Sequence, residues 1–221
     1  MNTFFLDRLN SEPHALAFAG QSTPWPVALA DQSANPALDE ALHTHAAAAQ
    51  ALLYPVSAEL LATTGRPVDL FGFEPNPARL GAAAAASASV PGIALTQLGA
   101  LLDAAALGYN PAQAKPVAVL GHSQGVLAVH MVQAICEAGS IDAAAAKIDE
   151  ILAIATLIGV AGTRQARQLG LAARHGEATP MLSVKDITRA QVDALIERVD
   201  GARGPIAVAV TNSATHYVLS G

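Results

Sequence analysis

The sequence predicts an α/β protein in which a parallel sheet flanked by helices precedes a smaller strand–helix–strand–strand unit. Two short apolar runs, each ended by a turn, predict buried strands. A change in the order of elements near the C-terminus predicts the smaller unit. Apolar residues make up 52% of the 221 residues and charged residues only 14%, which excludes a disordered chain.

The larger domain is expected over residues 1–178. Residues 14–19 predict a buried strand, and Gly20-Gln21-Ser22 with the breaker cluster Thr23-Pro-Trp-Pro26 predicts a loop after it. A helix is expected to begin at Asn35-Pro36, because a capping residue followed by proline is typical of a helix start.

Further helices follow in this domain. Pro55 is expected to kink or split the helix that begins at Asn35-Pro36. Residues 93–107 predict another helix, with Gly108 at its C-terminal end. Residues 141–166 predict a long helix near the end of the domain.

The chemistry is expected at Gly121-His122-Ser123-Gln124-Gly125, which matches the pattern G-x-S-x-G. An apolar strand at residues 116–120 precedes it and a helix at residues 126–138 follows it. Glycines at both flanks let the chain fold back sharply, so that the Ser123 hydroxyl is exposed at the start of the helix. This context predicts that Ser123 is a nucleophile.

A nucleophilic serine needs hydrogen-bond donors for the negative oxygen of the tetrahedral intermediate, the oxyanion. The backbone N–H of Gln124, the residue after the nucleophile, is the first expected donor. The second is expected from Gly20-Gln21, the loop after the first strand, and Gln21 is the residue assigned to it.

The smaller unit is expected over residues 179–221. Strands are predicted at residues 180–184, 206–210 and 217–220, and a helix capped by Thr188 at residues 188–199. This order makes up most of a ferredoxin-like unit, with one helix and one strand missing. The sequence is therefore expected to be a fragment of a longer polypeptide.

Several classes of function are excluded by composition. The single cysteine, Cys136, excludes a disulfide framework and a multi-thiolate metal site, and no histidine–carboxylate spacing indicates a metal. The net charge of −6 and the lack of a basic run argue against nucleic acid as a partner. The longest apolar run, residues 151–161, is too short to span a membrane, and the N-terminus does not resemble a signal peptide, so a cytoplasmic protein is expected.

The motif Gly121-His-Ser-Gln-Gly125 resembles the G-H-S-x-G of acyl-CoA:acyl-carrier-protein (ACP) acyltransferases. Ala19-Gly20-Gln21 is similar to the G-Q that follows the first strand of that family. Residues 91–97 (P-G-I-A-L-T-Q) are similar to its helix leading toward the nucleophile. Residues 179–183 and 211–221 are similar to the start and the hairpin end of its ferredoxin-like subdomain.

Within that family, the chain most resembles the acetyltransferase at the N-terminal end of type I fatty acid synthases of the fungal and actinobacterial kind. Val126 follows G-H-S-Q-G, where malonyl transferases have glutamate. The segment 69–77 (D-L-F-G-F-E-P-N-P) is also similar to this acetyltransferase. The resemblance implies an α/β-hydrolase-like acyltransferase core with a ferredoxin-like subdomain, both incomplete in this chain.

The resemblance also implies a reaction and its partners. An acetyl group would pass from acetyl-CoA to the Ser123 hydroxyl and then to the phosphopantetheine thiol of an ACP domain, which primes fatty acid synthesis. The domain would need no cofactor of its own. It would lie beside other fatty acid synthase domains in a large homo-oligomer, without nucleic acid or membrane partners.

Four residues are expected to line the substrate site. Ile158 occupies the position where malonyl transferases have an arginine that pairs with the malonyl carboxylate, so acetyl or another short monocarboxylic acyl group is expected; it also fits a plain core helix. Gln97 either orients the oxyanion loop or packs in a helix. Asn212 either lines the acyl and pantetheine pocket or serves a turn. His122 precedes the nucleophile, and its side chain is expected to point away from the pocket.

The general base is left open by the sequence. The family's base is a histidine in a later S-P-F-H-S-like segment that this sequence lacks, so the base is expected beyond Gly221 and the isolated chain to be nearly inactive. One alternative is a small serine esterase or thioesterase that uses Ser123, His216 and either Asp186 or Asp193. Another is a non-catalytic structural segment of a megasynthase.

Overall fold

The computed structural model describes residues 3–20, 24–62, 70–71, 86–168, 181–203 and 206–220. The chain divides into two compact units, Met1–Gln165 and Ala166–Gly221. The domain boundary expected at residue 178 lies outside the described residues.

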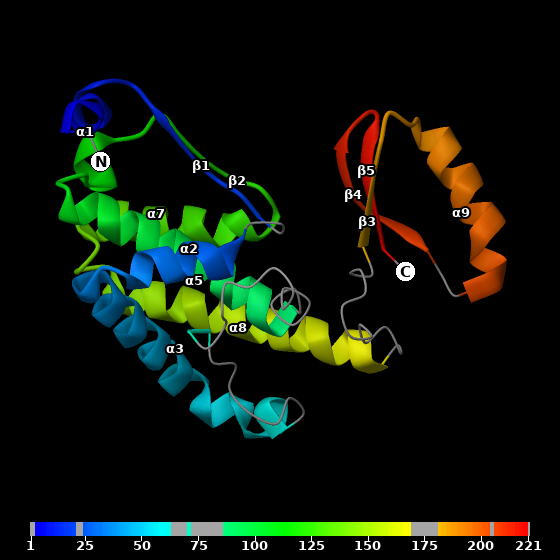
Figure 1. Ribbon diagram of the computed structural model, residues 1–221, viewed down its shortest axis with the longest axis horizontal. Helices are drawn as coiled ribbons and strands as arrows, with labels where there is room; N and C mark the ends of the chain where they lie inside the picture. The colour runs from blue at the N-terminus through cyan, green and yellow to red at the C-terminus, as the bar shows by residue number, and fades with distance from the viewer. Residues whose placement is uncertain are drawn as a thin grey trace. The chain divides into compact units, whose positions relative to one another are not determined.

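The first unit is mainly helical and carries one pair of strands (Figure 1). Its strands are β1 (Ala15–Phe18) and β2 (Ala118–Gly121). Its helices are α1 (Thr3–Ser11), α2 (Trp25–Ser33), α3 (Pro36–Ala62), α5 (Ala86–Ala106), α6 (Pro111–Ala114), α7 (Val126–Ala138) and α8 (Ala145–Gln168).

The two strands are parallel, as the sequence predicts, with Phe18 paired to Gly121 at their C-terminal ends. Leu16, Phe18 and Val119 lie on one face of this pair and pack against the core. Because the ends of parallel strands meet at one edge, the loop after β1 lies beside the turn after β2. This edge is where the candidate site forms.

Helix α5 is the central helix of the first unit. Its stretch from Ser87 to Gly99 is buried throughout, and Ile93 and Leu98 are almost fully enclosed. α5 is the one described helix long and apolar enough to cross a membrane by length and composition, but 67% of its most apolar 18-residue window is buried inside the protein. Burial on all sides explains its composition, because a core helix is apolar all round.

The structure corrects two predictions in this unit. The predicted loop at residues 23–26 gives way to α2 already at Trp25, because Pro24 precedes the helix and Pro26 lies in its first turn, where proline is tolerated. The helix predicted from residue 93 begins at Ala86 and contains Pro91. The helix end expected at Gly108 is confirmed, and the helix expected at residues 126–138 ends at Gly139; the two glycines have φ of 93° and 89°. Pro55 lies within α3, which forms a single helix.

The second unit has the strand–helix–strand–strand order expected from the sequence. β3 (Met181–Lys185), α9 (Arg189–Arg203), β4 (Ala207–Ser213) and β5 (His216–Ser220) form an antiparallel sheet of order β3-β5-β4 with one helix. Val192, Tyr217 and Leu219 are its buried core. Thr188 caps α9 through a reciprocal contact with Gln191.

Candidate active site

Ser123 lies at the sharp turn between β2 and α7, in a short 3₁₀ helix over Ser123–Gly125. Its φ is +53°, a left-handed conformation that costs a non-glycine residue about 1 kcal/mol or more. The residue is exposed. The turn is held by the N–H of His122, which donates to the Phe18 carbonyl (3.0 Å), and by the N–H of Gly125, which donates to the His122 carbonyl (2.9 Å). A strained and exposed serine at this position is the geometry expected of a nucleophile.

Two glycines of the motif are required by close packing. A Cβ on Gly121 would lie 2.6 Å from the Gly125 carbonyl carbon and from the Val126 nitrogen. A Cβ on Gly125 would overlap the Phe18 carbonyl oxygen. The strand, turn and helix therefore fit together only without side chains at these two positions.

Gly20, in the loop after β1, lies directly against this turn. A Cβ at Gly20 would be 2.7 Å from Ser123 Cβ and 3.2 Å from the Gln124 backbone nitrogen. The loop predicted to carry the second oxyanion donor therefore lies beside both the nucleophile and the first expected donor. Gln21, to which that second donor was assigned, lies outside the described residues.

Gln97 reaches this loop from α5. Its side chain is 8% exposed, and its Nε2 donates to the Ala19 carbonyl at 2.6 Å, one residue before Gly20. Its Oε1 is buried without a hydrogen-bond partner among the described residues. The acceptor is a backbone carbonyl, so no side-chain pattern in the sequence could have identified it.

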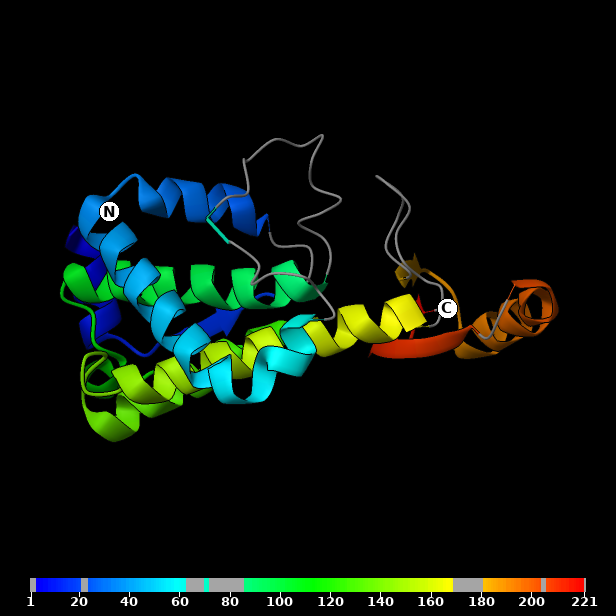
Figure 2. The same ribbon diagram turned by 90° about the horizontal axis from the view of Figure 1, so that it is seen from below.

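Ile158 lies on α8 and is 51% exposed, so it is not the enclosed core residue that was one of its two expected roles. α7 and α8 are joined by residues 139–144, and the two views show the helices along a common direction, so α8 runs back toward the nucleophile end of α7 (Figures 1 and 2). From that connection, Val126 on α7 and Ile158 on α8 are each about 20 Å along their helix, at about 1.5 Å per residue. Ile158 therefore lies at about the same level as the start of α7. The residue after Ile158, Gly159, packs tightly on the Ala86 backbone at the start of α5.

Asn212 and His216 belong to the second unit. The Nε2 of His216 lies 2.9 Å from the Ser183 hydroxyl and 3.4 Å from Asn212 Nδ2. Ser183 was not identified from the sequence, since a lone serine in a strand carries no local signal. The esterase alternative needs His216 as the general base for Ser123. Within the second unit, the His216 imidazole contacts the Ser183 hydroxyl, and the alternative stays a prediction.

Three of the five described histidines of the first unit pair with other side chains. No described histidine is hydrogen-bonded to the Ser123 hydroxyl, and His122 and His130 are exposed. The other three pair with Tyr109 (His14), Asp39 (His43) and Asp149 (His45). Within the described part of the chain, no group of three or more histidine, cysteine or acidic residues could hold a metal ion.

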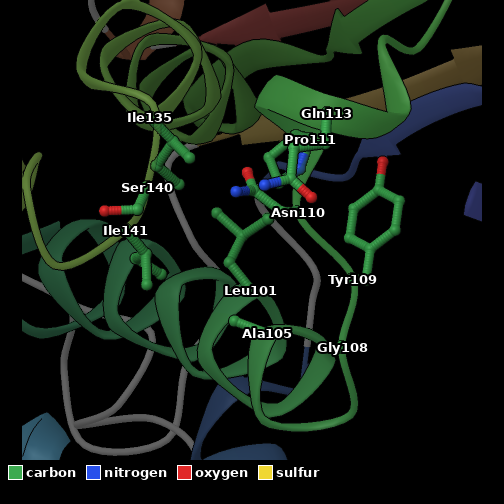
Figure 3. Close-up of a pocket in the computed structure, with 10 residues that line it drawn as sticks. All are labelled: Leu101, Ala105, Gly108, Tyr109, Asn110, Pro111, Gln113, Ile135, Ser140 and Ile141. Atoms are coloured by element: carbon green, nitrogen blue, oxygen red, sulfur yellow. The ribbon is translucent and has the colours of Figure 1, made fainter.

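A cavity of about 220 Å³ lies at the opposite end of α7 (Figure 3). Leu101, Ala105, Ile135 and Ile141 line its apolar part, and Asn110 borders it while donating to the Gly139 carbonyl at 2.9 Å. The length of α7 separates this cavity from Ser123 by about 18 Å. The cavity is therefore not part of the Ser123 site.

The chain was compared with known proteins. A family profile described as "starter unit:ACP transacylase in aflatoxin biosynthesis" matches residues 74–221, which are two thirds of the chain and include Ser123. No curated protein matches the chain. Transacylases of this kind move a starter acyl group to an ACP domain in a multidomain synthase, a reaction for which an exposed serine at a strand–helix turn is suited. The chain belongs to the starter unit:ACP transacylase family.

Proposed function

We propose that this chain transfers an acetyl or another short monocarboxylic acyl group from coenzyme A to the phosphopantetheine thiol of an ACP domain, and so primes a type I fatty acid synthase. The observation that carries the proposal is the exposed Ser123 at φ +53°, with Gly20 packed against it. The fatty acid synthase context rests on the sequence motifs, among them G-H-S-Q-G followed by Val126. We also propose that the first unit has an α/β-hydrolase-like fold and that the second unit has a ferredoxin-like fold.

The reaction proceeds in two half-reactions. The Ser123 Oγ attacks the thioester carbonyl carbon, its proton passes to a general base, and the C–S bond breaks as the coenzyme A thiol leaves with a proton. The phosphopantetheine thiol then attacks the Ser123 ester, and the serine hydroxyl is restored. In both steps the Gln124 backbone N–H donates to the oxyanion, and the loop after Gly20 supplies the second donor.

The acyl preference follows from Ile158. A malonyl carboxylate beside Ile158 would gain no positively charged partner, whereas an acetyl methyl group would pack on the isoleucine side chain. Because Ile158 is half exposed, a longer side chain fits there without disturbing the core. Ile158→Arg is therefore expected to raise malonyl transfer at least tenfold relative to acetyl transfer, since arginine binds a carboxylate with two hydrogen bonds.

Ile154 provides a matched control for this substitution. It lies one turn earlier on α8 and is 49% exposed, so Ile154→Arg adds the same charge at an equally accessible position. The control should leave the acetyl-to-malonyl ratio within twofold of the unmodified chain. Equal effects of the two substitutions would show that the position of Ile158 does not set the acyl preference.

The test of the proposal is acyl labelling with radioactive acetyl-CoA of a longer polypeptide that includes the segment after Gly221, where the general base is expected, with the label located by mass spectrometry. Label on Ser123 that disappears in Ser123→Ala, and that moves to a phosphopantetheine thiol, is the expected result. Cys136 is the competing nucleophile, so Cys136→Ser serves as a control. Partial burial and the nearby Glu137 carboxylate raise the pKa of the Cys136 thiol, so it is mostly protonated at pH 7. A folded longer polypeptide whose Ser123 stays unlabelled would refute the proposal.

A further inference from the structure

A serine and a histidine meet on the face of the second unit's sheet that lies opposite its core. Tyr217 and Leu219 of β5 point into that core, so His216 points to the opposite face, because side chains alternate along a strand. On the neighbouring strand β3, Val184 packs on the core and Ser183 therefore lies on the same face as His216. Ser183 is exposed and His216 is half-buried. Both side chains are thus within reach of a dissolved reagent.

The two side chains are within hydrogen-bond distance of each other. The Ser183 hydroxyl oxygen lies 2.9 Å from His216 Nε2, across the β3–β5 pair. Asn212 approaches the same ring nitrogen from β4, on the other side of β5, and its Nδ2 lies 3.4 Å away. Asn212 stands at a register shift between Thr211 and Ser213, and such irregularities turn a side chain toward a face that regular pairing would not give it.

The Asn212 contact indicates which way the hydrogen bonds run. An amide nitrogen only donates, so Asn212 Nδ2 bonds to His216 Nε2 only if that ring nitrogen is the acceptor. The Ser183 hydroxyl then donates to the same nitrogen. A hydroxyl whose proton points at an accepting imidazole nitrogen is the arrangement of a nucleophile and its general base.

We propose that Ser183 and His216 form a second acyl-accepting site, which takes short acyl groups from activated esters or thioesters independently of Ser123. The Ser183 Oγ attacks the carbonyl carbon, and His216 Nε2 takes up the hydroxyl proton. The bond between the carbonyl carbon and the leaving oxygen or sulfur then breaks, and the leaving group receives the proton from Nε2. The product is an ester on Ser183. This proposal does not depend on the proposed function of Ser123.

The test is acetylation of the Ser123→Ala chain by p-nitrophenyl acetate, with the acetyl groups located by mass spectrometry over time. Ser183 is expected to react about tenfold faster than Ser11, an equally exposed serine whose hydroxyl donates to the Asp7 carbonyl and not to a histidine. His216→Gln keeps a polar side chain without a basic nitrogen. This substitution should slow Ser183 about tenfold and leave Ser11 unchanged.

Two controls make the reading specific. Hydroxylamine removes an acetyl ester from serine but not an acetyl amide from lysine, which matters because Lys185 is the register partner of His216. Circular dichroism shows whether each variant is folded. Because Ser183 is exposed and His216 half-buried, both substitutions leave the core residues of the second unit in place, and His216→Asn repeats the measurement if His216→Gln does not fold.

Each outcome decides the proposal. Acetyl on Ser183 that hydroxylamine removes and that loss of the imidazole slows supports the second site. A folded chain whose Ser183 reacts no faster than Ser11, or reacts equally fast with and without His216, overturns it. Acetylation of Ser183 together with an unlabelled Ser123 in the longer polypeptide would refute the proposed function and leave this inference standing, and the reverse result would have the reverse meaning.

Discussion

Gly20→Ala tests how closely the loop after β1 must approach the nucleophile. The new Cβ would lie 2.5 Å from the His122 carbonyl oxygen and 2.7 Å from Ser123 Cβ. Two non-bonded carbons need about 3.5 Å, so the loop and the turn must separate by roughly 0.8 Å. The neighbours are backbone and a Cβ, which cannot rotate away as the end of a flexible side chain can. The loop after β1 and the Ser123 turn, which carry the two expected oxyanion donors, must therefore move apart.

A displacement of this size is expected to lower the acylation rate constant about 100-fold, or about 2.7 kcal/mol in the barrier, because misplacing one oxyanion donor by about 1 Å costs that much. Overpacking should lower the free energy of unfolding by about 1 to 3 kcal/mol. Acetyl labelling of Ser123 over time, with urea unfolding of the same sample, measures both. Gly162→Ala, whose Cβ would have only ordinary contact with Ala86 at 3.4 Å, is the control. A folded Gly20→Ala chain that labels Ser123 at the original rate would refute the reasoning.

Two further predictions concern strain and burial. In urea unfolding, Ser123→Gly should have a free energy of unfolding about 1 kcal/mol higher than Ser123→Ala. Glycine adopts the φ of +53° without a Cβ penalty, and both variants lose the hydroxyl. Equal free energies would argue against strain at the nucleophile. Asp149→Ala should cost about 2 kcal/mol by thermal unfolding, because Asp149 Oδ1 lies 2.6 Å from His45 Nδ1 with both side chains largely buried. Glu150→Ala, which removes the exposed partner of Lys147 at the same 2.6 Å, should show no measurable loss, and equal losses would contradict this prediction.

The nucleophile turn could be predicted because its determinants are local. An apolar strand, two glycines around Ser123 and a helix ended by Gly139 lie within about 25 residues, and each has one plausible conformation. The strand–helix–strand–strand unit was predictable for the same reason, since its turns and its Thr188 cap are marked in the sequence.

The remaining features depend on contacts between distant segments. Pro24 and Pro26 indicated a loop, but prolines at a helix start are compatible with α2, and its apolar residues are ordered by packing on α5. The Gln32 amide of α2 lies over Gly99 of α5, where a Cβ would be 2.6 Å from the amide carbon, and no spacing rule connects these two residues, which are 67 positions apart. Likewise, the exposure of Ile158 depends on which face of α8 meets the core, and an almost wholly apolar stretch does not mark that face.

The register partners Phe18 and Gly121 have a consequence for biosynthesis. They are about 100 positions apart in the sequence. Closing so long a loop is entropically unfavourable until the helices between the two strands have formed and can pack against them. A nascent polypeptide emerging from the ribosome would therefore hold no reactive serine centre until α7 had left the exit tunnel.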